Sequence, residues 1–243
     1  MTPAAPADVT FEPLGEEAVV AVFGHTLDAD ANERACRFAD AVLAARLAYV
    51  TDVVPSFVAC AVHYRAPDVP TGEFQLPQDA VIQRLRRIVG RTPKAGRSSR
   101  IEPVEIPVCY GGEMGPDLEE AAAACGMAPD ELVRLHAGTR GARVFLIGFS
   151  PGAPYIGVHD ERLSIRRRTS PRKAVPAGSI GIANRQTVIY PEQTPGGWNL
   201  IGRTPLRLFD LARTPASLLR AGMPVKFRAI DEAQYQSWLR AAQ

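Results

Sequence analysis

Glycine and proline are too dense between residues 145 and 210 for an ordinary surface loop, and this density constrains the fold more than any other feature of the chain. Proline fixes φ and removes a backbone donor, whereas glycine permits a positive φ or a close backbone approach. Between the turns lie short apolar runs at residues 144–149, 179–183 and 187–190. Short strands separated by turn residues at this spacing predict a small β-barrel or β-sandwich.

The N-terminal part has a different pattern. Residues 17–23 and 56–64 favour strands, whereas residues 29–48 and 77–89 repeat apolar side chains at helical spacing, with Asp28 or Asp30 as the N-cap of the first helix. This alternation predicts a small α/β module. Residues 91–100 are polar, basic and without apolar periodicity, so we expect a linker there.

We therefore expect an α+β protein, with a small α/β domain at residues 1–92 and a strand-rich domain at residues 93–243. The second domain is expected to open with a strand at 101–110, followed by helices at 116–125 and 129–136, where proline and acidic residues mark each helix start.

Composition excludes several classes of function. A net charge of +2 argues against nucleic acid as the main partner. The four cysteines are scattered without a CxxC pair, so we expect neither a metal site nor a redox pair. The N-terminus has no signal-peptide pattern, and no apolar run approaches the ~20 residues of a membrane span. We expect a soluble, cytoplasmic protein that binds no membrane.

The sequence GFSPG at residues 148–152 matches the GxSxG pattern of a serine hydrolase. That nucleophile must be followed by a helix, which Pro151, Gly152 and Pro154 disfavour. Ser150 is therefore better interpreted as a turn residue that shapes a pocket. Residues 178–181 match neither GxGxxG nor a phosphate-binding P-loop. No catalytic residue is assigned.

Several side chains near these turns could bind a ligand. Arg172 and Arg203 could grip a carboxylate or phosphate, although Arg203 could equally satisfy loop carbonyls. Trp198 could stack on a ligand or plug the end of a barrel. His136 falls at the end of a predicted helix, where a capping or packing role and a site role both stay open.

Several segments resemble the KipI/PxpB family, which includes the PxpB component of 5-oxoprolinase and allophanate hydrolase subunit 1 and is related to carboxyltransferase subdomains of urea amidolyase. They are GFSPGAPYIG (148–157), PRKAVPAGSIGIA (171–183), QTVIYP (186–191) and TPGGWNLIGRTPLRLFD (194–210). VCYGGEMGPDLEEAA (108–122) and FEPLGEEAVVAVFG (11–24) also resemble family segments. Ala153 replaces a phenylalanine of the family pattern, and Asn184 and Val188 replace glycines.

The resemblance implies that the second domain is a cyclophilin-like β-barrel. It further implies a subunit of an ATP-dependent 5-oxoprolinase that uses ATP with Mg²⁺, acting with a KipA/PxpC-type subunit and with or without a PxpA-type subunit. The alternatives are a KipI-like inhibitor of a sensor histidine kinase and an allophanate- or urea amidolyase-type carboxyl-transfer module. The ligand-binding candidates are His136, Phe149, Ser150, Pro151, Tyr155, Arg172, Gln186, Tyr190, Trp198 and Arg203.

Overall fold

The computed structural model describes residues 9–74, 76–91, 102–157 and 160–241. These residues form two compact units, one on each side of residue 100. All of the expected linker beyond Arg91 lies outside the described residues, so the assignment of two domains stays a prediction.

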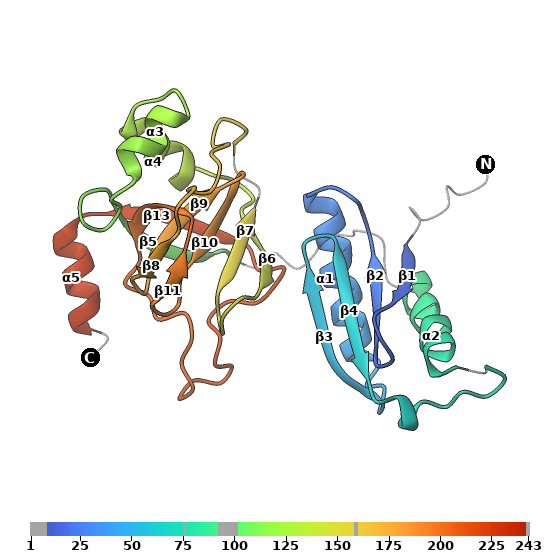
Figure 1. Ribbon diagram of the computed structural model, residues 1–243. Helices are drawn as coiled ribbons and strands as arrows, with labels where there is room; N and C mark the ends of the chain where they lie inside the picture. Colours follow the sequence, from blue (N-terminus) through green and yellow to red (C-terminus); the bar gives the residue numbers. More distant parts are fainter. Residues whose placement is uncertain (1–8, 75, 92–101, 158–159, 242–243) are drawn as a thin grey trace. The chain divides into compact units, whose positions relative to one another are not determined.

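The N-terminal unit is a four-stranded antiparallel sheet in the order β1-β2-β4-β3, with two helices packed on it (Figure 1). Its elements are β1 (Thr10–Pro13), β2 (Ala18–Val22), α1 (Ala29–Ala44), β3 (Val50–Ser56), β4 (Ala59–Tyr64), a 3₁₀ turn (Ala66–Asp68) and α2 (Pro77–Arg91). β1 and β3 were not predicted from the sequence. β1 ends in a proline, and β3 carries Asp52 and Pro55 and is largely exposed, so neither has the apolar alternation that marks a half-buried strand.

The helices begin where the sequence predicts. The Asp28 carboxylate accepts a hydrogen bond from the Ala31 N–H at 2.9 Å and so caps α1. Phe38 of α1 and Leu85 of α2 are buried in one core with the inward-facing residues of the sheet. Of the two aspartates proposed for the cap, Asp28 has that role.

The C-terminal unit contains β5 (Val104–Tyr110), α3 (Leu118–Ala124), α4 (Pro129–Ala137), β6 (Arg143–Ile147), β7 (Pro154–Gly157), β8 (Arg172–Val175), β9 (Ser179–Ala183), β10 (Gln186–Ile189), β11 (Thr194–Gly196), β12 (Asn199–Arg203), β13 (Val225–Ile230) and α5 (Glu232–Ala241). Seven strands form a sheet in the order β13-β5-β12-β9-β10-β7-β6, and β8 pairs with β11 in a separate ribbon. Only the β13–β5 pair within the sheet is parallel.

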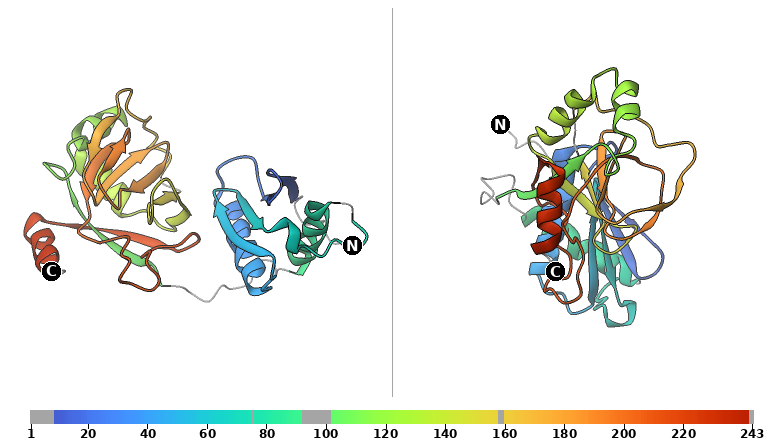
Figure 2. Two further views of the ribbon diagram at one scale, coloured as in Figure 1. Left: turned by 60° about the horizontal axis from the view of Figure 1, so that its bottom comes forward. Right: turned by 90° about the vertical axis from the view of Figure 1, so that its left-hand side faces the viewer.

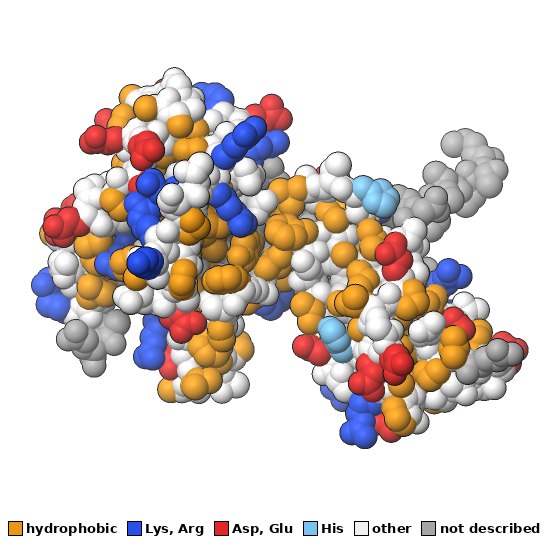
Figure 3. All heavy atoms as spheres, in the orientation of Figure 1, with side chains coloured by type: hydrophobic (Ala, Val, Ile, Leu, Met, Phe, Trp, Pro, Cys, Tyr) orange, Lys and Arg blue, Asp and Glu red, His pale blue; other side chains and the backbone are white. Residues whose placement is uncertain are grey.

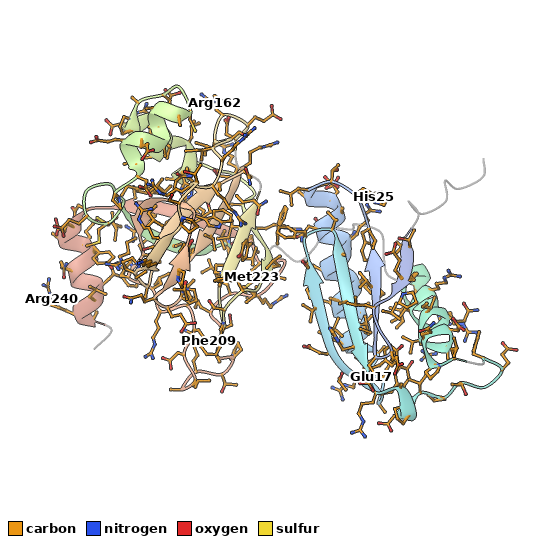
Figure 4. All side chains as sticks on the ribbon, in the orientation of Figure 1. Glu17, His25, Arg162, Phe209, Met223 and Arg240 are labelled. Carbon is orange, nitrogen blue, oxygen red and sulfur yellow. The ribbon has the colours of Figure 1, made fainter. Side chains whose placement is uncertain are left out.

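The large sheet curls until its two edge strands approach each other. Arg143 of β6 forms a bridge with Pro224, the residue before β13, and the Val144 N–H donates to the Met223 carbonyl at 2.9 Å. Met223, which Figure 4 labels, marks this junction. The curvature gives the sheet a concave apolar interior, and Figure 2 shows the unit from two further directions.

The two faces of this sheet are covered differently. α3 and α4 pack on one face, over a core that includes Ile156, Ile182 and Ile189. The other face carries a smaller cluster around Val188, Tyr190 and Trp198, next to β8. In the described part of the chain, no helix is long and apolar enough to cross a membrane.

Candidate functional site

A cavity of about 290 Å³ lies in the C-terminal unit, on the face of the sheet opposite α3 and α4. Its lining comes from the turn before β7, the segment before β8, and the segment from β10 to Trp198. The lining residues are Phe149, Ser150, Ala153, Tyr155, Arg167, Arg168, Pro171, Val188, Ile189, Tyr190, Pro191, Pro195, Gly196, Gly197 and Trp198. Figure 3 shows Lys and Arg side chains among hydrophobic ones on the face of this unit that carries β8 and β11.

Three aromatic side chains form the apolar wall. Tyr155 meets Trp198 edge-to-face with ring centroids 5.9 Å apart, and Trp198 and Tyr190 are each 5% exposed. A Cβ at Gly181 would lie 2.7 Å from Cβ of Trp198, so glycine is needed there for the indole to lie on the sheet. The glycine-rich pattern therefore supports the stacking role expected of Trp198.

Burial dominates the chemistry of the two phenols. It raises the pKa of Tyr190 to about 12, against smaller lowering effects from the Trp198 backbone hydrogen bond and from Arg167 and Arg172. Burial also raises the pKa of Tyr155, and the nearby Arg167 charge opposes this. Both phenols stay protonated at neutral pH and act as neutral groups in the cavity.

The positive charge of the cavity comes from consecutive arginines before β8. The guanidinium carbon of Arg167 lies 5.0 Å from the centroid of the Trp198 ring, within the range of a cation–π interaction. Arg168 donates to Asp117 at 3.0 Å and to Glu120 at 3.3 Å, while its buried Nε has no hydrogen-bond partner among the described residues. None of the residues that line this cavity is Asp or Glu.

Arg172 has a different environment from the one its motif suggested. Its two terminal nitrogens donate to the two carboxylate oxygens of Asp117 at 2.8 and 2.6 Å. Asp117 is buried and also accepts from the Leu200 N–H at 2.7 Å. Arg172 thus links β8 to the start of α3 and to β12, and it is not among the residues lining the cavity.

His136 lies on the other face of the sheet, in the core. Its Nδ1 is 2.7 Å from the Tyr110 hydroxyl, and its Nε2 is 2.9 Å from the Thr187 hydroxyl. The ring stacks near Phe227 with centroids 4.3 Å apart. His136 does end a helix, as predicted, but its contacts are those of a buried packing group.

The remaining candidates surround the cavity without lining it. Gln186 begins β10 and is half-buried, and Pro151 is exposed in the turn before β7. The Arg203 Nε donates to the Ala177 carbonyl at 2.9 Å, as in the interpretation in which it satisfies a loop carbonyl. The structure therefore brings together Phe149, Ser150, Tyr155, Tyr190 and Trp198, but places His136, Pro151, Arg172, Gln186 and Arg203 outside the lining.

The turn before β7 has an unusual backbone. Phe149 has φ = 71°, a left-handed conformation that a bulky residue rarely adopts, and it is 78% exposed. The Ser150 carbonyl accepts from the Ala153 N–H at 3.1 Å, and a strand rather than a helix follows at Pro154. The nucleophile-elbow interpretation of GFSPG is thus excluded by the structure, as the prolines indicated.

Sequence reasoning did not single out Arg167, Arg168 and Asp117. The two arginines belong to a basic run whose ordinary interpretation is a solvated surface, and Asp117 looked like one of several acidic residues at a helix start. Among the residues that the structure describes, no group of His, Cys, Asp and Glu could hold a metal ion.

Comparison with known proteins places this chain in a family. The family model for the carboxyltransferase domain, subdomain C and D, matches residues 9–219. The chain belongs to this family, as the motifs predicted.

Two curated relatives, each named as the second (B) component of 5-oxoprolinase, are similar over nearly their whole length. The relative from Bacillus subtilis (strain 168) is 38% identical to this chain, with 93% of this chain and 95% of the relative covered. The relative of the same name from Escherichia coli O157:H7 is 40% identical, with 88% and 93% covered.

Solved structures have the same fold. The crystal structure of TTHA0988 has a TM-score of 0.74 and 32% identity, and the match covers 88% of this chain but only 40% of that one. The chain therefore spans less than half of this longer protein. The K. lactis urea amidolyase, at 14% identity and a TM-score of 0.71, matches 96% of this chain and 15% of its own. That last likeness concerns the fold alone.

Proposed function

We propose that this protein is one subunit of an ATP-dependent 5-oxoprolinase, which converts 5-oxo-L-proline to L-glutamate together with a KipA/PxpC-type subunit. The observation that carries the proposal is the near full-length similarity to relatives named as the B component of 5-oxoprolinase. In this proposal the C-terminal unit is a cyclophilin-like β-barrel domain and the N-terminal unit a separate α/β domain.

The chemistry of a lactam favours a cavity like the one described. An amide carbonyl is a poor electrophile, and transfer of a phosphoryl group from ATP to its oxygen creates a leaving group that water can then displace. The ligand and the developing charge are anionic, so arginines in a largely apolar cavity suit both. Arg167 and Arg168, with no acidic residue beside them in the lining, support this assignment.

ATP itself needs groups beyond this cavity. None of the lining residues belongs to a helix, so no helix N-terminus presents backbone N–H groups to phosphates there. No described cluster of acidic residues and histidines suits Mg²⁺. We infer that a partner subunit contributes the phosphate-binding and catalytic groups.

Phe149 is a candidate contact for that partner. Its ring is 78% exposed at the edge of the cavity, on a backbone conformation that costs on the order of 1–3 kcal/mol. Exposed aromatic residues are frequent anchors in interfaces, and a strained turn is retained where the surroundings or the function require it.

Reconstitution tests the proposal. The purified chain alone should have negligible 5-oxoproline-dependent ATP hydrolysis, and activity should rise strongly when the KipA/PxpC-type subunit is added. Phe149→Ala should raise the concentration of partner needed for half-maximal activity, whereas Leu211→Ala, which removes another highly exposed apolar side chain, should leave it unchanged. Full activity of the isolated chain would contradict the shared site. No activity in any combination of subunits would contradict the 5-oxoprolinase assignment.

One alternative has a specific observation in its favour. The family description and the likeness to urea amidolyase suit a carboxyl-transfer module. Such a module would need a biotin-carrying partner, so avidin should inhibit the reconstituted activity, whereas a 5-oxoprolinase should be insensitive to avidin.

A further inference from the structure

We propose that Arg167, with its guanidinium on the Trp198 ring, is the residue that binds the carboxylate of the ligand, which is a small carboxylate-bearing lactam. This inference rests on the proposed function and assigns a role to a residue that the family motifs did not point to.

The argument begins with the fate of the neighbouring arginine. Arg172 makes two hydrogen bonds to Asp117, and Asp117 is 4% exposed, so the motif arginine already holds a carboxylate belonging to the protein. A ligand carboxylate would have to displace a buried internal partner to reach it. Releasing such a pair leaves an uncompensated buried charge, which disfavours the exchange.

Arg168 is partly committed in the same way. One terminal nitrogen contacts both Asp117 and Glu120, and the orphaned Nε is the part of this guanidinium that is left to satisfy an acceptor. Arg168 can support a bound oxyanion but is held in place by the acidic residues of α3 and its start.

Arg167 is the arginine available to a ligand. It lines the cavity, and the described residues give its guanidinium no carboxylate partner, only the indole of Trp198 at 5.0 Å. Its charge also acts on the phenols of Tyr155 and Tyr190, which places it over the aromatic wall. A planar guanidinium fixed on a ring keeps its N–H edge free for two-point contact with a carboxylate.

The cavity also limits the size of the ligand. At about 290 Å³, it is at the small end of ligand pockets and is bounded by Tyr155, Tyr190 and Trp198. A compact, flat ring can stack on these side chains while its carboxylate reaches Arg167. A phosphate of ATP has related chemistry, and the experiment separates the two sources.

Fluorescence of Trp198 reports binding directly. The chain has two tryptophans, so Trp238→Phe serves as the background in which Trp198 is the only one. Into this protein, alone and bound to its partner, 5-oxoproline, its carboxamide 5-oxoprolinamide, and Mg-ATP are titrated separately. We expect 5-oxoproline to change the emission and the carboxamide to bind at least about tenfold more weakly, because a charge-assisted bond is lost.

The variants assign the effect to one side chain. Arg167→Ala should raise the dissociation constant for 5-oxoproline at least about tenfold, and Arg167→Lys should recover only part of it. Arg166→Ala is the matched control: it removes the same charge from the adjacent exposed residue, which does not line the cavity. In the assembled complex, Arg167→Ala should raise KM far more than it lowers kcat, as loss of uniform binding does.

The inference is overturned by equal binding of acid and carboxamide, by equal effects of Arg167→Ala and Arg166→Ala, or by an Arg167-dependent response to Mg-ATP but not to 5-oxoproline. Absence of any 5-oxoproline response in both forms also overturns it. If acid-selective, Arg167-dependent binding occurs but the complex hydrolyses no ATP, the proposed enzyme activity fails and the binding assignment stands.

Discussion

Adjacent residues of β10 have opposite surroundings. Thr187 is fully buried and contacts His136, on the face covered by α3 and α4. Val188 faces the aromatic cavity with Tyr190 and Trp198. Because successive side chains of a strand point to opposite faces, one residue of register separates a closed core from a ligand site.

The comparison shows how the unit divides its polar groups. The polar atoms on the helix-covered face contact one another, as His136 does with Tyr110 and Thr187. The face with the cavity keeps Arg167 on an aromatic ring without a carboxylate partner among the described residues. The first arrangement stabilises a fold, whereas the second retains a charge that a ligand can use.

Asp117 joins the two faces, and its removal should have the largest effect. It lies at the start of α3, yet it binds Arg172 of β8 and the Leu200 N–H of β12. Asp117→Ala would leave two arginines and a buried N–H without this acceptor. We expect a loss of about 3 kcal/mol in the free energy of unfolding, measured by chemical denaturation.

Glu120→Ala provides the matched control for Asp117→Ala. Glu120 also pairs with Arg168, at 3.3 Å, but its side chain is 75% exposed. Its removal should change the free energy of unfolding by less than about 1 kcal/mol. Similar losses for the two variants would mean that Asp117 is not the bond between the faces that the geometry describes.

A reciprocal exchange on β10 tests the two faces themselves. Thr187→Val removes the hydroxyl 2.9 Å from His136 Nε2 and should cost about 1 kcal/mol of stability. Binding of 5-oxoproline should be unchanged. Val188→Thr places a hydroxyl of nearly the same shape in the cavity wall, so it should change ligand affinity more than stability. Calorimetric unfolding and ligand titration of both variants give the answer.

The opposite outcome would revise the role of His136. If Thr187→Val weakened ligand binding at unchanged stability, the buried histidine would belong to the ligand site rather than to the core. The candidate set drawn from the motifs would then be the better description.

The order of strands in the C-terminal unit was largely predictable because glycine and proline mark its turns. The run at residues 179–183 matches β9 residue for residue, and Asn184 and Arg185, with φ of 50° and 62°, form the tight turn into β10. No helix was predicted from the sequence at α5, and β3 was hidden by Asp52 and Pro55. Those elements depend on packing that no local pattern records.

The candidate site was predictable in its aromatic half and not in its charges. Tyr155, Tyr190 and Trp198 stand within glycine- and proline-rich motifs, and the structure places all three in one cavity. Arg172 stands in a motif too, but its partner Asp117 lies 55 residues away in the sequence. A sequence does not state which carboxylate pairs with which arginine, so the cation left for a ligand could be identified only from the fold.

The smallest effect at neutral pH, and one confined to alkaline solution, concerns Tyr190. Its pKa is raised to about 12 in the folded protein by burial, whereas an unfolded tyrosine has a pKa of about 10. The native state therefore retains the proton longer than the unfolded state does. The resulting contribution to stability is fully present below pH ~10 and is lost as pH rises from ~10 to ~12.

Other buried tyrosines contribute in the same direction, so the difference between wild type and Tyr190→Phe isolates this one. Tyr190→Phe should unfold with a shallower dependence on pH above ~10, because phenylalanine does not ionise, and should differ little in that dependence below ~9. Urea unfolding across this range measures the effect. Tyr155, the other phenol of the cavity, is less buried and also has a raised pKa, so Tyr155→Phe should flatten the curve less. Parallel pH curves for wild type and Tyr190→Phe would mean that water reaches the Tyr190 hydroxyl, and that the aromatic wall of the cavity is more open than its packing against Trp198 indicates.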